Sequence, residues 1–411
     1  MRRSPRLSWL RLAAASLLLA AGSSQAQRVT EIPAGPEFDR GIACPFPYCS
    51  ATVSALDGNT AVMTGAGVGV LVRSAPDVWN LQQELWNPDA VPASPSASMG
   101  YPAAVSGDVL LATGTSRIYN LKPVIYVWKR SGTTWTHTQV LAPPRPAGFD
   151  KTAVASVQLD QTTAAVCTVQ RDTAATRAQA QIDLYVLKSN GRFVRQAQLI
   201  PPLTLQQGNR CHLALEGNTL LVGDPLADLG NGRVLVYERG SAGWILRRRL
   251  AAADSTPGAL FGTSADISGN TIVAGAPGRP NFDQPRHPGA AYVFQRTATG
   301  WAQIQVLVKP VVETDPPIPE ESHPIFGELV SVSGDRLVTT WNSSDFLLSQ
   351  TYLYERRGVW APVAGLVTYP ELSSVRVYLS GSVAIQTMNV MISFPHELPP
   401  LWTLPPRVEG P

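Results

Sequence analysis

Short runs of alternating apolar and polar residues follow one another along most of the chain, separated by turns that contain glycine. The stretch Phe261–Gly278 holds an alternating run, a Ser-Gly-Asn turn and a second apolar run. After a loop come Ala291–Arg296 and then, beyond a turn at Gly300, the run Trp301–Leu307. Apolar residues at every second position predict β-strands, and glycine supplies the positive φ that a two-residue hairpin turn needs. We therefore predict four short antiparallel strands in this unit.

The same unit recurs along the chain. The equivalent turns centre on Gly58, Gly107, Gln161, Gly217, Gly269, Gly334 and Gly381. An aromatic residue follows each turn at the expected start of a fourth strand: Trp79, Trp135, Phe193, Trp244, Trp301, Trp360 and Trp402. One four-stranded sheet cannot bury both of its faces, whereas sheets arranged radially bury each other. The sequence predicts an all-β fold, a single seven-bladed β-propeller of four-stranded antiparallel blades over residues 51–411, with the aromatic residues packed between blades.

Residues 1–26 have the parts of an export signal. Met1–Arg11 is basic, Leu12–Gly22 is apolar, and Ser24–Ala26 places small residues at the two positions that signal peptidase reads. An apolar stretch of about eleven residues is too short to span a bilayer of roughly 30 Å. We predict cleavage before Gln27 and an exported protein, periplasmic or secreted, without membrane insertion.

Composition and charge narrow the classes of partner. With 44% hydrophobic and 15% charged residues, the chain is a folded protein rather than a disordered one. It carries 33 Lys and Arg against 30 Asp and Glu, and the signal removes basic residues only, so the mature chain is near neutral. Basic residues are scattered, and Arg247–Arg249 is the only run of three. The sequence contains no basic stripe of the kind that a nucleic-acid partner would require.

Export makes disulfides chemically possible, and the chain has four cysteines. Cys44 and Cys49 are close enough to close a stapled loop within residues 27–50. That segment either caps an end of the propeller or lends a strand that closes the ring. Cys167 and Cys211 lie in neighbouring units, where they form either a second bridge or two buried thiols.

Several strings resemble the FG-GAP repeat of integrin α-subunit propellers and of many exported bacterial proteins. They are Leu260–Gly262 for the first half and Val273–Gly278 for the second, followed by Ala291–Phe294. Ile325–Gly327 matches the first half again; Val222–Pro225 and Thr64–Gly67 match the second half in part. The resemblance is strong in the fifth unit and weak over the rest of the mature chain. It implies a seven-bladed propeller used for recognition and adhesion.

The sequence departs from the calcium-binding members of that family. Those members have an acid-rich loop between the two halves, whereas Ile267–Asn270 stands there in this chain. A two-residue turn cannot wrap a cation that takes six or more oxygen ligands. Asp224 and Asp228 are isolated acids, for which we expect ordinary loop solvation. No metal and no other cofactor is predicted.

No catalytic residue is predicted. The G-x-S-x-G, H-E-x-x-H, phosphate-loop and C-x-x-C-H patterns are missing from the sequence. The five histidines belong to different units: His137, His212, His287, His323 and His396. His212 follows Cys211 in an expected strand, where we expect it to pack.

Long connections are better candidates for function, because binding residues concentrate on loops held by a rigid scaffold. The two longest are Arg279–Pro288, within unit five, and Lys309–Pro324, between units five and six. The candidate binding residues in them are Asn281, Asp283, Arg286, His287, Glu313, Asp315 and Glu320.

These observations predict an exported, non-catalytic binding or adhesion module that recognises a protein or polysaccharide surface through its inter-strand loops. The alternative is a hydrolase acting on a glycan or ester, with a site assembled at the propeller channel. Three or more acids, histidines or arginines within hydrogen-bonding reach there would favour that alternative. A third hypothesis is a structural component of an envelope assembly, which an exposed apolar patch on the order of several hundred Å² would indicate.

Overall fold

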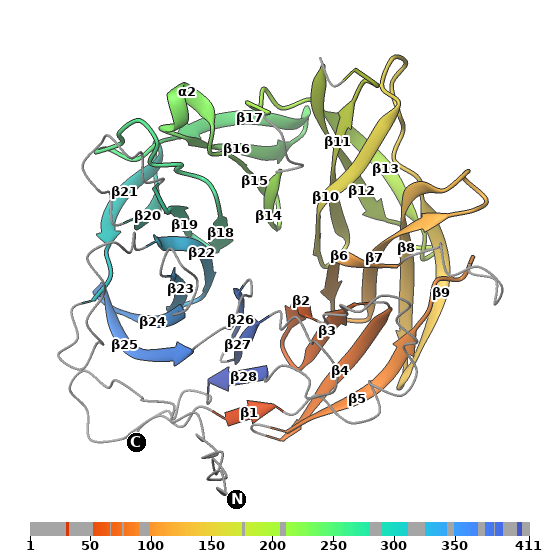
Figure 1. Ribbon diagram of the computed structural model, residues 1–411, viewed down its shortest axis with the longest axis horizontal. Helices are drawn as coiled ribbons and strands as arrows, with labels where there is room; N and C mark the ends of the chain where they lie inside the picture. Colours follow the sequence, from red (N-terminus) through yellow and green to blue (C-terminus); the bar gives the residue numbers. More distant parts are fainter. Residues whose placement is uncertain are drawn as a thin grey trace, which may run out of the picture.

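The computed structural model describes residues 30–32, 52–65, 67–75, 78–89, 99–174, 177–205, 211–278, 289–310, 325–342, 349–368, 375–381, 383–388 and 401–404. The chain is an all-β propeller of four-stranded antiparallel blades, arranged around a common centre (Figure 1). The predicted fold class is confirmed at that level. Among the described residues, no helix is long and apolar enough to cross a membrane.

Six blades each use four consecutive strands, paired in chain order. Blade 1 contains β2 (Thr52–Asp57), β3 (Thr60–Thr64), β4 (Val68–Ala75) and β5 (Val78–Leu85). Blade 2 contains β6 (Met99–Ser106), β7 (Val109–Ser116), β8 (Lys122–Ser131) and β9 (Thr134–Leu141). Blade 3 contains β10 (Lys151–Asp160), β11 (Thr163–Arg171), β12 (Ala178–Leu187) and β13 (Phe193–Leu199). Blade 4 contains β14 (His212–Glu216), β15 (Thr219–Asp224), the short helix α2 (Ala227–Gly230), β16 (Arg233–Gly240) and β17 (Gly243–Leu250). Blade 5 contains β18 (Ala265–Ser268), β19 (Thr271–Ala276), β20 (Ala290–Thr297) and β21 (Gly300–Leu307). Blade 6 contains β22 (Ile325–Ser333), β23 (Arg336–Asn342), β24 (Ser349–Arg357) and β25 (Val359–Thr368).

A further four-stranded sheet joins the two ends of the chain. It contains β26 (Val375–Ser380), β27 (Val383–Met388), β28 (Leu401–Leu404) and, on its outer side, β1 (Thr30–Ile32). Strand β1 pairs antiparallel with β28, with Glu31 opposite Trp402 (Figure 1). The N-terminal segment therefore lends a strand. The prediction that Trp402 opens a fourth strand is wrong, because β1 takes the fourth position and β28 becomes the third.

The recurring turn also fastens each blade to the next. The first turn residue has positive φ, +52° at Gly58 and +49° at Gln161, the only residue of the series that is not glycine. Its backbone N–H donates to the side chain that precedes the equivalent turn one blade earlier. The acceptors are Asp57, Ser106, Asp160, Glu216, Ser268, Ser333 and Ser380, at distances of 2.5 to 3.0 Å. The sequence repeat is thus an interblade contact as well as a turn.

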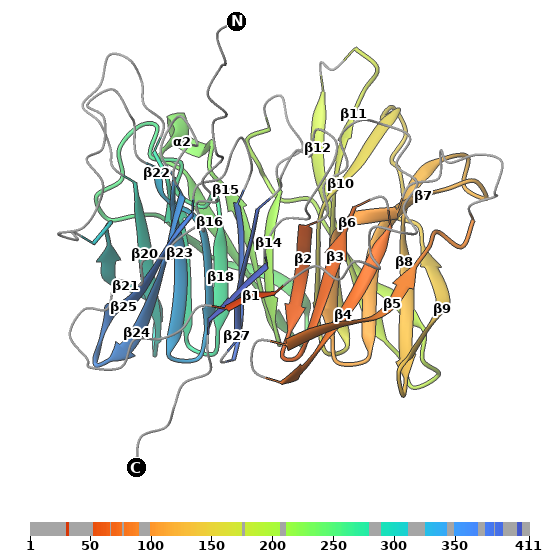
Figure 2. The ribbon, with the colours of Figure 1, turned by 60° about the horizontal axis from the view of Figure 1, so that its bottom comes forward.

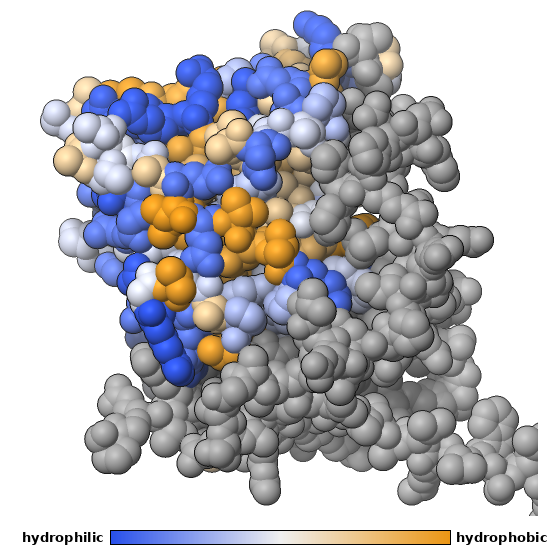
Figure 3. All heavy atoms as spheres, turned by 90° about the vertical axis from the view of Figure 1, so that its left-hand side faces the viewer, coloured by the Kyte–Doolittle hydropathy of each residue, from blue (hydrophilic) through white to orange (hydrophobic). Residues whose placement is uncertain are grey.

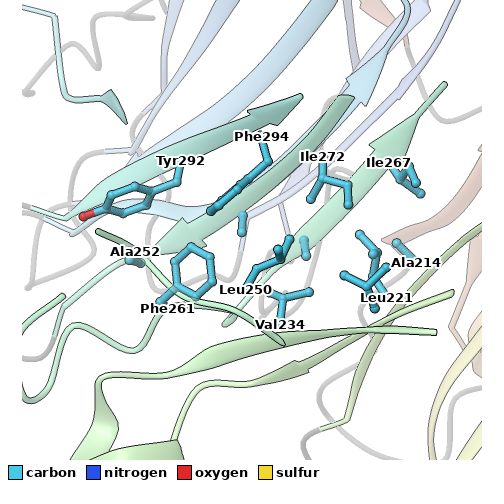
Figure 4. Close-up of a cluster of buried hydrophobic side chains, with 14 of the residues drawn as sticks. Ala214, Leu221, Val234, Leu250, Ala252, Phe261, Ile267, Ile272, Tyr292 and Phe294 are labelled. Carbon is cyan, nitrogen blue, oxygen red and sulfur yellow. The ribbon is translucent and has the colours of Figure 1, made fainter. Parts of the chain in front are cut away.

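The aromatic residues of the fourth strands pack between blades, as predicted. Trp135 lies in the core that blades 1 and 2 share, and Trp244 in the core between blades 3 and 4. Figure 4 shows the core between blades 4 and 5, where Phe261, Tyr292 and Phe294 face Val234 and its neighbours. Apolar burial of this kind stabilises by roughly 25 cal/mol per Å² and is the main force that holds the blades together.

The two halves of the FG-GAP pattern meet across blade boundaries. Phe261 is fully buried, and Gly262 follows it with φ +87°. A Cβ atom on Gly223 of blade 4 would lie 2.1 Å from the Gly262 carbonyl oxygen. At the next boundary, a Cβ on Gly275 would lie 1.9 Å from the Gly327 carbonyl oxygen. Glycine is needed here because the backbones of neighbouring blades touch.

A disulfide joins Cys167 of β11 to Cys211, directly before β14, with their Cα atoms 6.4 Å apart. Both residues are buried in the core between blades 3 and 4. Of the two alternatives for this pair, the structure shows the bridge. Cys44 and Cys49 lie outside the described residues, as do residues 1–26.

Candidate functional site

The two faces of the propeller differ in the length of their connections. Connections between first and second strands are two-residue turns, such as Gly58-Asn59, and leave on one face, which we call the turn face. Connections between second and third strands, and from one blade to the next, leave on the opposite face, the loop face. In Figure 2 the tight turns lie along the lower edge and the longer connections and α2 along the upper edge. Variable chemistry is therefore concentrated on the loop face.

The residues predicted for binding belong to two connections of the loop face. Asn281, Asp283, Arg286 and His287 stand between β19 and β20, whereas Glu313, Asp315 and Glu320 stand between β21 and β22. All seven residues lie outside the described part of the chain. Their role stays a prediction.

A central channel of about 300 Å³ is lined by residues from the innermost region of every sheet. Most of its lining side chains are aliphatic or carry hydroxyl groups. Among the described residues of that lining, His212 and Asp266 are the only histidine and the only acid, and there is no arginine. The described lining therefore does not bring together the three acids, histidines or arginines that would favour the hydrolase hypothesis.

Both of these polar groups connect blades. His212 Nε2 lies 2.7 Å from the carbonyl oxygen of Ala265, to which Nε2–H donates, and burial lowers the pKa of this imidazole. Asp266 Oδ2 accepts hydrogen bonds from Ser331 Oγ and from the Val332 backbone N–H, both at 2.8 Å. Desolvation raises the pKa of Asp266 to about 6, against the opposing effect of these hydrogen bonds. The expected packing role of His212 is confirmed.

Asp224 is not the solvated loop acid that the sequence suggested. Its side chain is buried, accepts the Thr204 backbone N–H at 2.8 Å and pairs with Arg233 Nη2 at 2.8 Å. The reason is its place at the end of β15, where it anchors the segment that precedes blade 4. Within the described ranges, no three acids, histidines or cysteines gather as a group that could hold a metal ion.

Large apolar side chains are exposed on the loop face of blades 1 and 2. The set, which we call the aromatic surface, contains Trp86 (45% exposed), Tyr101 (51%), which also lines the central channel, Ile118 (75%), Tyr119 (39%) and Leu121 (53%). Trp86 directly follows β5, Tyr101 belongs to the start of β6, and the other three belong to the connection between β7 and β8. The signal for this surface in the sequence is Ile118-Tyr119-Asn120-Leu121, an apolar cluster within a connection, and sequence reasoning missed it.

Polar contacts hold the aromatic surface in place. Asn87 Nδ2 donates to the Thr115 carbonyl oxygen at 2.9 Å. Asp89 accepts hydrogen bonds from the Ser116 hydroxyl and, at 2.9 Å, from the Tyr126 hydroxyl. These bonds clamp the segment that follows Trp86 of blade 1 against the end of β7 in blade 2. The backbone next to Trp86 and that at the end of β7 are therefore held together by hydrogen bonds.

Comparison with known proteins gives the following likenesses. The family model of the FG-GAP repeat matches residues 244–294, from β17 to β20. No curated protein matches this chain in sequence. The β-propeller domain of the Trilobed protease from Pyrococcus furiosus is 10% identical, with 87% of this chain and 93% of that chain covered and a TM-score of 0.46. A mutant of the Aleuria aurantia lectin in complex with α-methyl-L-fucoside is 12% identical, with coverages of 75% and 92% and a TM-score of 0.41. The uncomplexed acylaminoacyl peptidase of Pyrococcus horikoshii is 9% identical, with coverages of 87% and 51% and a TM-score of 0.48. Likenesses at these identities carry no information on function.

Proposed function

We propose that this chain, which carries an FG-GAP repeat in a β-propeller fold, is an exported, non-catalytic binding module that recognises a protein or polysaccharide surface through its loop face. The observation that carries the proposal is the aromatic surface on blades 1 and 2. We propose that the connections 279–288 and 309–324, which join strands at the same face, also take part in binding. Their candidate contacts are Asn281, Asp283, Arg286, His287, Glu313, Asp315 and Glu320.

The aromatic surface has the properties of a preformed contact area. Exposed apolar patches are rare on soluble monomers unless they serve an interaction. Aromatic anchors provide much of the binding energy in interfaces, and Trp86 and Tyr119 are exposed anchors of this kind. The clamp made by Asn87 and Asp89 lowers the entropy that would be lost if the segment had to be ordered on binding.

Export is supported by the bridge between Cys167 and Cys211, because stable disulfides form in oxidising compartments. We propose that residues 1–26 are the export signal, that the mature chain starts at Gln27, and that Cys44 and Cys49 form a second bridge. The mature protein is then periplasmic or secreted.

We further propose that residues 51–411 form one propeller together with the N-terminal strand β1, which completes a seventh blade of β26, β27, β28 and β1 and closes the ring. The Gly58 N–H donates to Ser380 Oγ at 2.9 Å and the Gly381 N–H donates to Ser333 Oγ at 2.8 Å, so this sheet is joined to the blades on both sides. Removing residues 27–32 should lower the free energy of unfolding by about 2 kcal/mol, since the backbone bonds to β28 are lost. Urea unfolding measures this change. An unchanged midpoint and slope would show that β1 does not close the ring.

Binding to intact host cells tests the function. The labelled mature protein, with its N-terminus checked by intact mass, is titrated onto native cells before and after protease treatment or periodate oxidation of glycans. The double variant Trp86→Ala with Ile118→Ser should bind at least about tenfold more weakly, because two exposed anchors are removed. The two cell treatments separate a protein ligand from a polysaccharide ligand.

The matched control places the same kind of change at the turn-face ends of β17 and β25. Ile245 and Val359 are also exposed apolar residues, 36% and 66%. The double variant Ile245→Ser with Val359→Ser should bind as the wild type does. If the Trp86 and Ile118 variant keeps full binding, the aromatic surface is not the binding site.

A further inference from the structure

The outermost strand of each blade pairs with one neighbour only among the described strands, so its other backbone edge meets no described strand. Folded proteins normally make such edges unattractive to other strands by placing charged or polar side chains on them. The blades of this propeller are repeats, so equivalent edge positions can be compared within one molecule. Each outer strand from β5 to β25 has a β-bulge opposite its third strand, and the bulge residue marks the same position in every blade.

Blade 5 differs from the preceding blades at this edge. The bulge residue and the residue two places further on are Gln82 and Glu84 in β5, Thr138 and Val140 in β9, Gln196 and Gln198 in β13, and Arg247 and Arg249 in β17. In β25 they are Val363, which is half-buried, and Gly365. In β21 they are Ile304, 52% exposed, and Val306, 37% exposed, and Val308 follows at 56%. The repeat does not require apolar residues at these positions, because four other blades hold at least one polar residue there.

Ile304 and Val306 alternate along β21 and so share one side of the strand, and Val308 follows directly after its end. The whole of β21, Gly300–Leu307, contains no charged residue. Figure 3 shows the side of the molecule where β21 lies, and apolar side chains gather near its centre, among hydrophilic ones. The result is a strand edge that pairs with no other described strand, has an apolar side and carries no charged residue of its own.

We infer that β21 pairs with β21 of a second copy of this chain, antiparallel across a two-fold axis. A strand centred on Val306 places Val306 opposite its counterpart and Ile304 opposite Val308, so every pair on that side is apolar. The paired residues from Ile304 to Val308 bring no charge of their own to this edge, whereas β17 paired with itself would bring its arginines together. The pairing gives one continuous sheet of two blades and satisfies the backbone groups of this edge.

The two-fold axis lies at the outer rim, so the pairing leaves the loop faces of both copies uncovered. A dimer of this kind has two loop faces. The inference does not depend on the proposed function, since self-association is measured without any ligand.

Sedimentation equilibrium of the mature chain, up to about 100 µM, tests the pairing. The wild type should show the mass of a dimer. The double variant Ile304→Arg with Val306→Arg should have a dissociation constant at least about tenfold higher, because four arginines would meet at the two-fold axis. Blade 4 already carries Arg247 and Arg249 at these positions, so the fold accepts the change, and thermal unfolding of the monomer should stay the same.

The control and a second variant keep the test decisive. Gln196→Arg with Gln198→Arg makes the same change on β13 and should leave the dimer intact. Val306→Cys should form a disulfide between copies on mild oxidation, since the residue faces its counterpart, whereas Gln198→Cys should not. A wild type that stays monomeric at the highest concentration, or a dimer that persists in the Ile304 and Val306 variant, overturns the inference.

Discussion

Replacing Gly275 by alanine should lower the free energy of unfolding by about 3 kcal/mol or more. The added Cβ would lie 1.9 Å from the Gly327 carbonyl oxygen and 3.0 Å from its carbonyl carbon. Both atoms belong to the backbone of blade 6, so no side-chain rotation can relieve the overlap. The two blades would have to move apart, which opens the core that they share around Phe326 and disrupts well-packed apolar contacts.

Urea unfolding of the variant, followed by tryptophan fluorescence, measures this loss. Gly240→Ala is the matched control: a Cβ on Gly240 meets no atom within 4 Å, so its stability should stay within about 0.5 kcal/mol of the wild type. Gly223→Ala repeats the test one boundary earlier, where the Cβ would lie 2.1 Å from the Gly262 carbonyl oxygen. If Gly275→Ala unfolds at the wild-type urea concentration, the backbones of blades 5 and 6 do not approach as closely as described.

The strands and turns of this propeller were predictable because their signals are local. A period-two run and the positive φ at Gly58 concern residues that are neighbours in sequence. The glycines of the FG-GAP pattern were recognisable in the sequence, but the structural reason why glycine is needed there was not. Gly275 is constrained by Gly327, which belongs to the next blade, and only the fold brings the two together.

The predictions that were wrong failed because they depend on contacts between segments that are distant in sequence. Trp402 has the sequence context of a fourth-strand aromatic, yet its strand is third because β1, from the other end of the chain, takes the outer position. The polar residue before each turn looked like part of a turn signature. Asp57 in fact accepts the N–H of Gly107, which stands one blade further on. Contacts between repeats cannot be recognised from the sequence of a single repeat.

The candidate site was less predictable than the fold. Loop length led to residues 279–288 and 309–324, because length can be read from the sequence. The aromatic surface depends instead on exposure. Ile118 and Tyr119 are apolar residues of a kind that most often packs inside, and the hydrogen bond from Asn87 to Thr115 that helps hold their surroundings crosses a blade boundary. Asp224 shows the reverse case, a loop acid that is buried because Arg233 pairs with it.

The boundary between blades 3 and 4 is held by a different device from the boundaries on either side of blade 5. Strands β10 to β13 contain no glycine, so blade 3 cannot take part in the close backbone contact made at Gly223 and Gly275. At this boundary the disulfide between Cys167 and Cys211 joins the two blades instead, and it closes a loop with a sequence separation of 44. A covalent link here restricts the unfolded chain and keeps the two blades together when either one loosens.

The double variant Cys167→Ala with Cys211→Ala should therefore lose about 3 to 4 kcal/mol of unfolding free energy. Urea unfolding with and without a thiol reductant separates the bridge from the packing of its side chains. The unfolding free energy of the wild type should fall toward that of the variant once the bridge is reduced in the unfolded state. The unfolding free energy of the variant should not change on addition of the reductant, because the variant lacks this bridge. Because the bridge is buried in the shared core with Ile182 and Leu213, reduction should require unfolding conditions. Peptide mapping under non-reducing conditions checks the pairing, and a wild type with free thiols at both positions, or a variant as stable as the wild type, would show that packing alone holds this boundary.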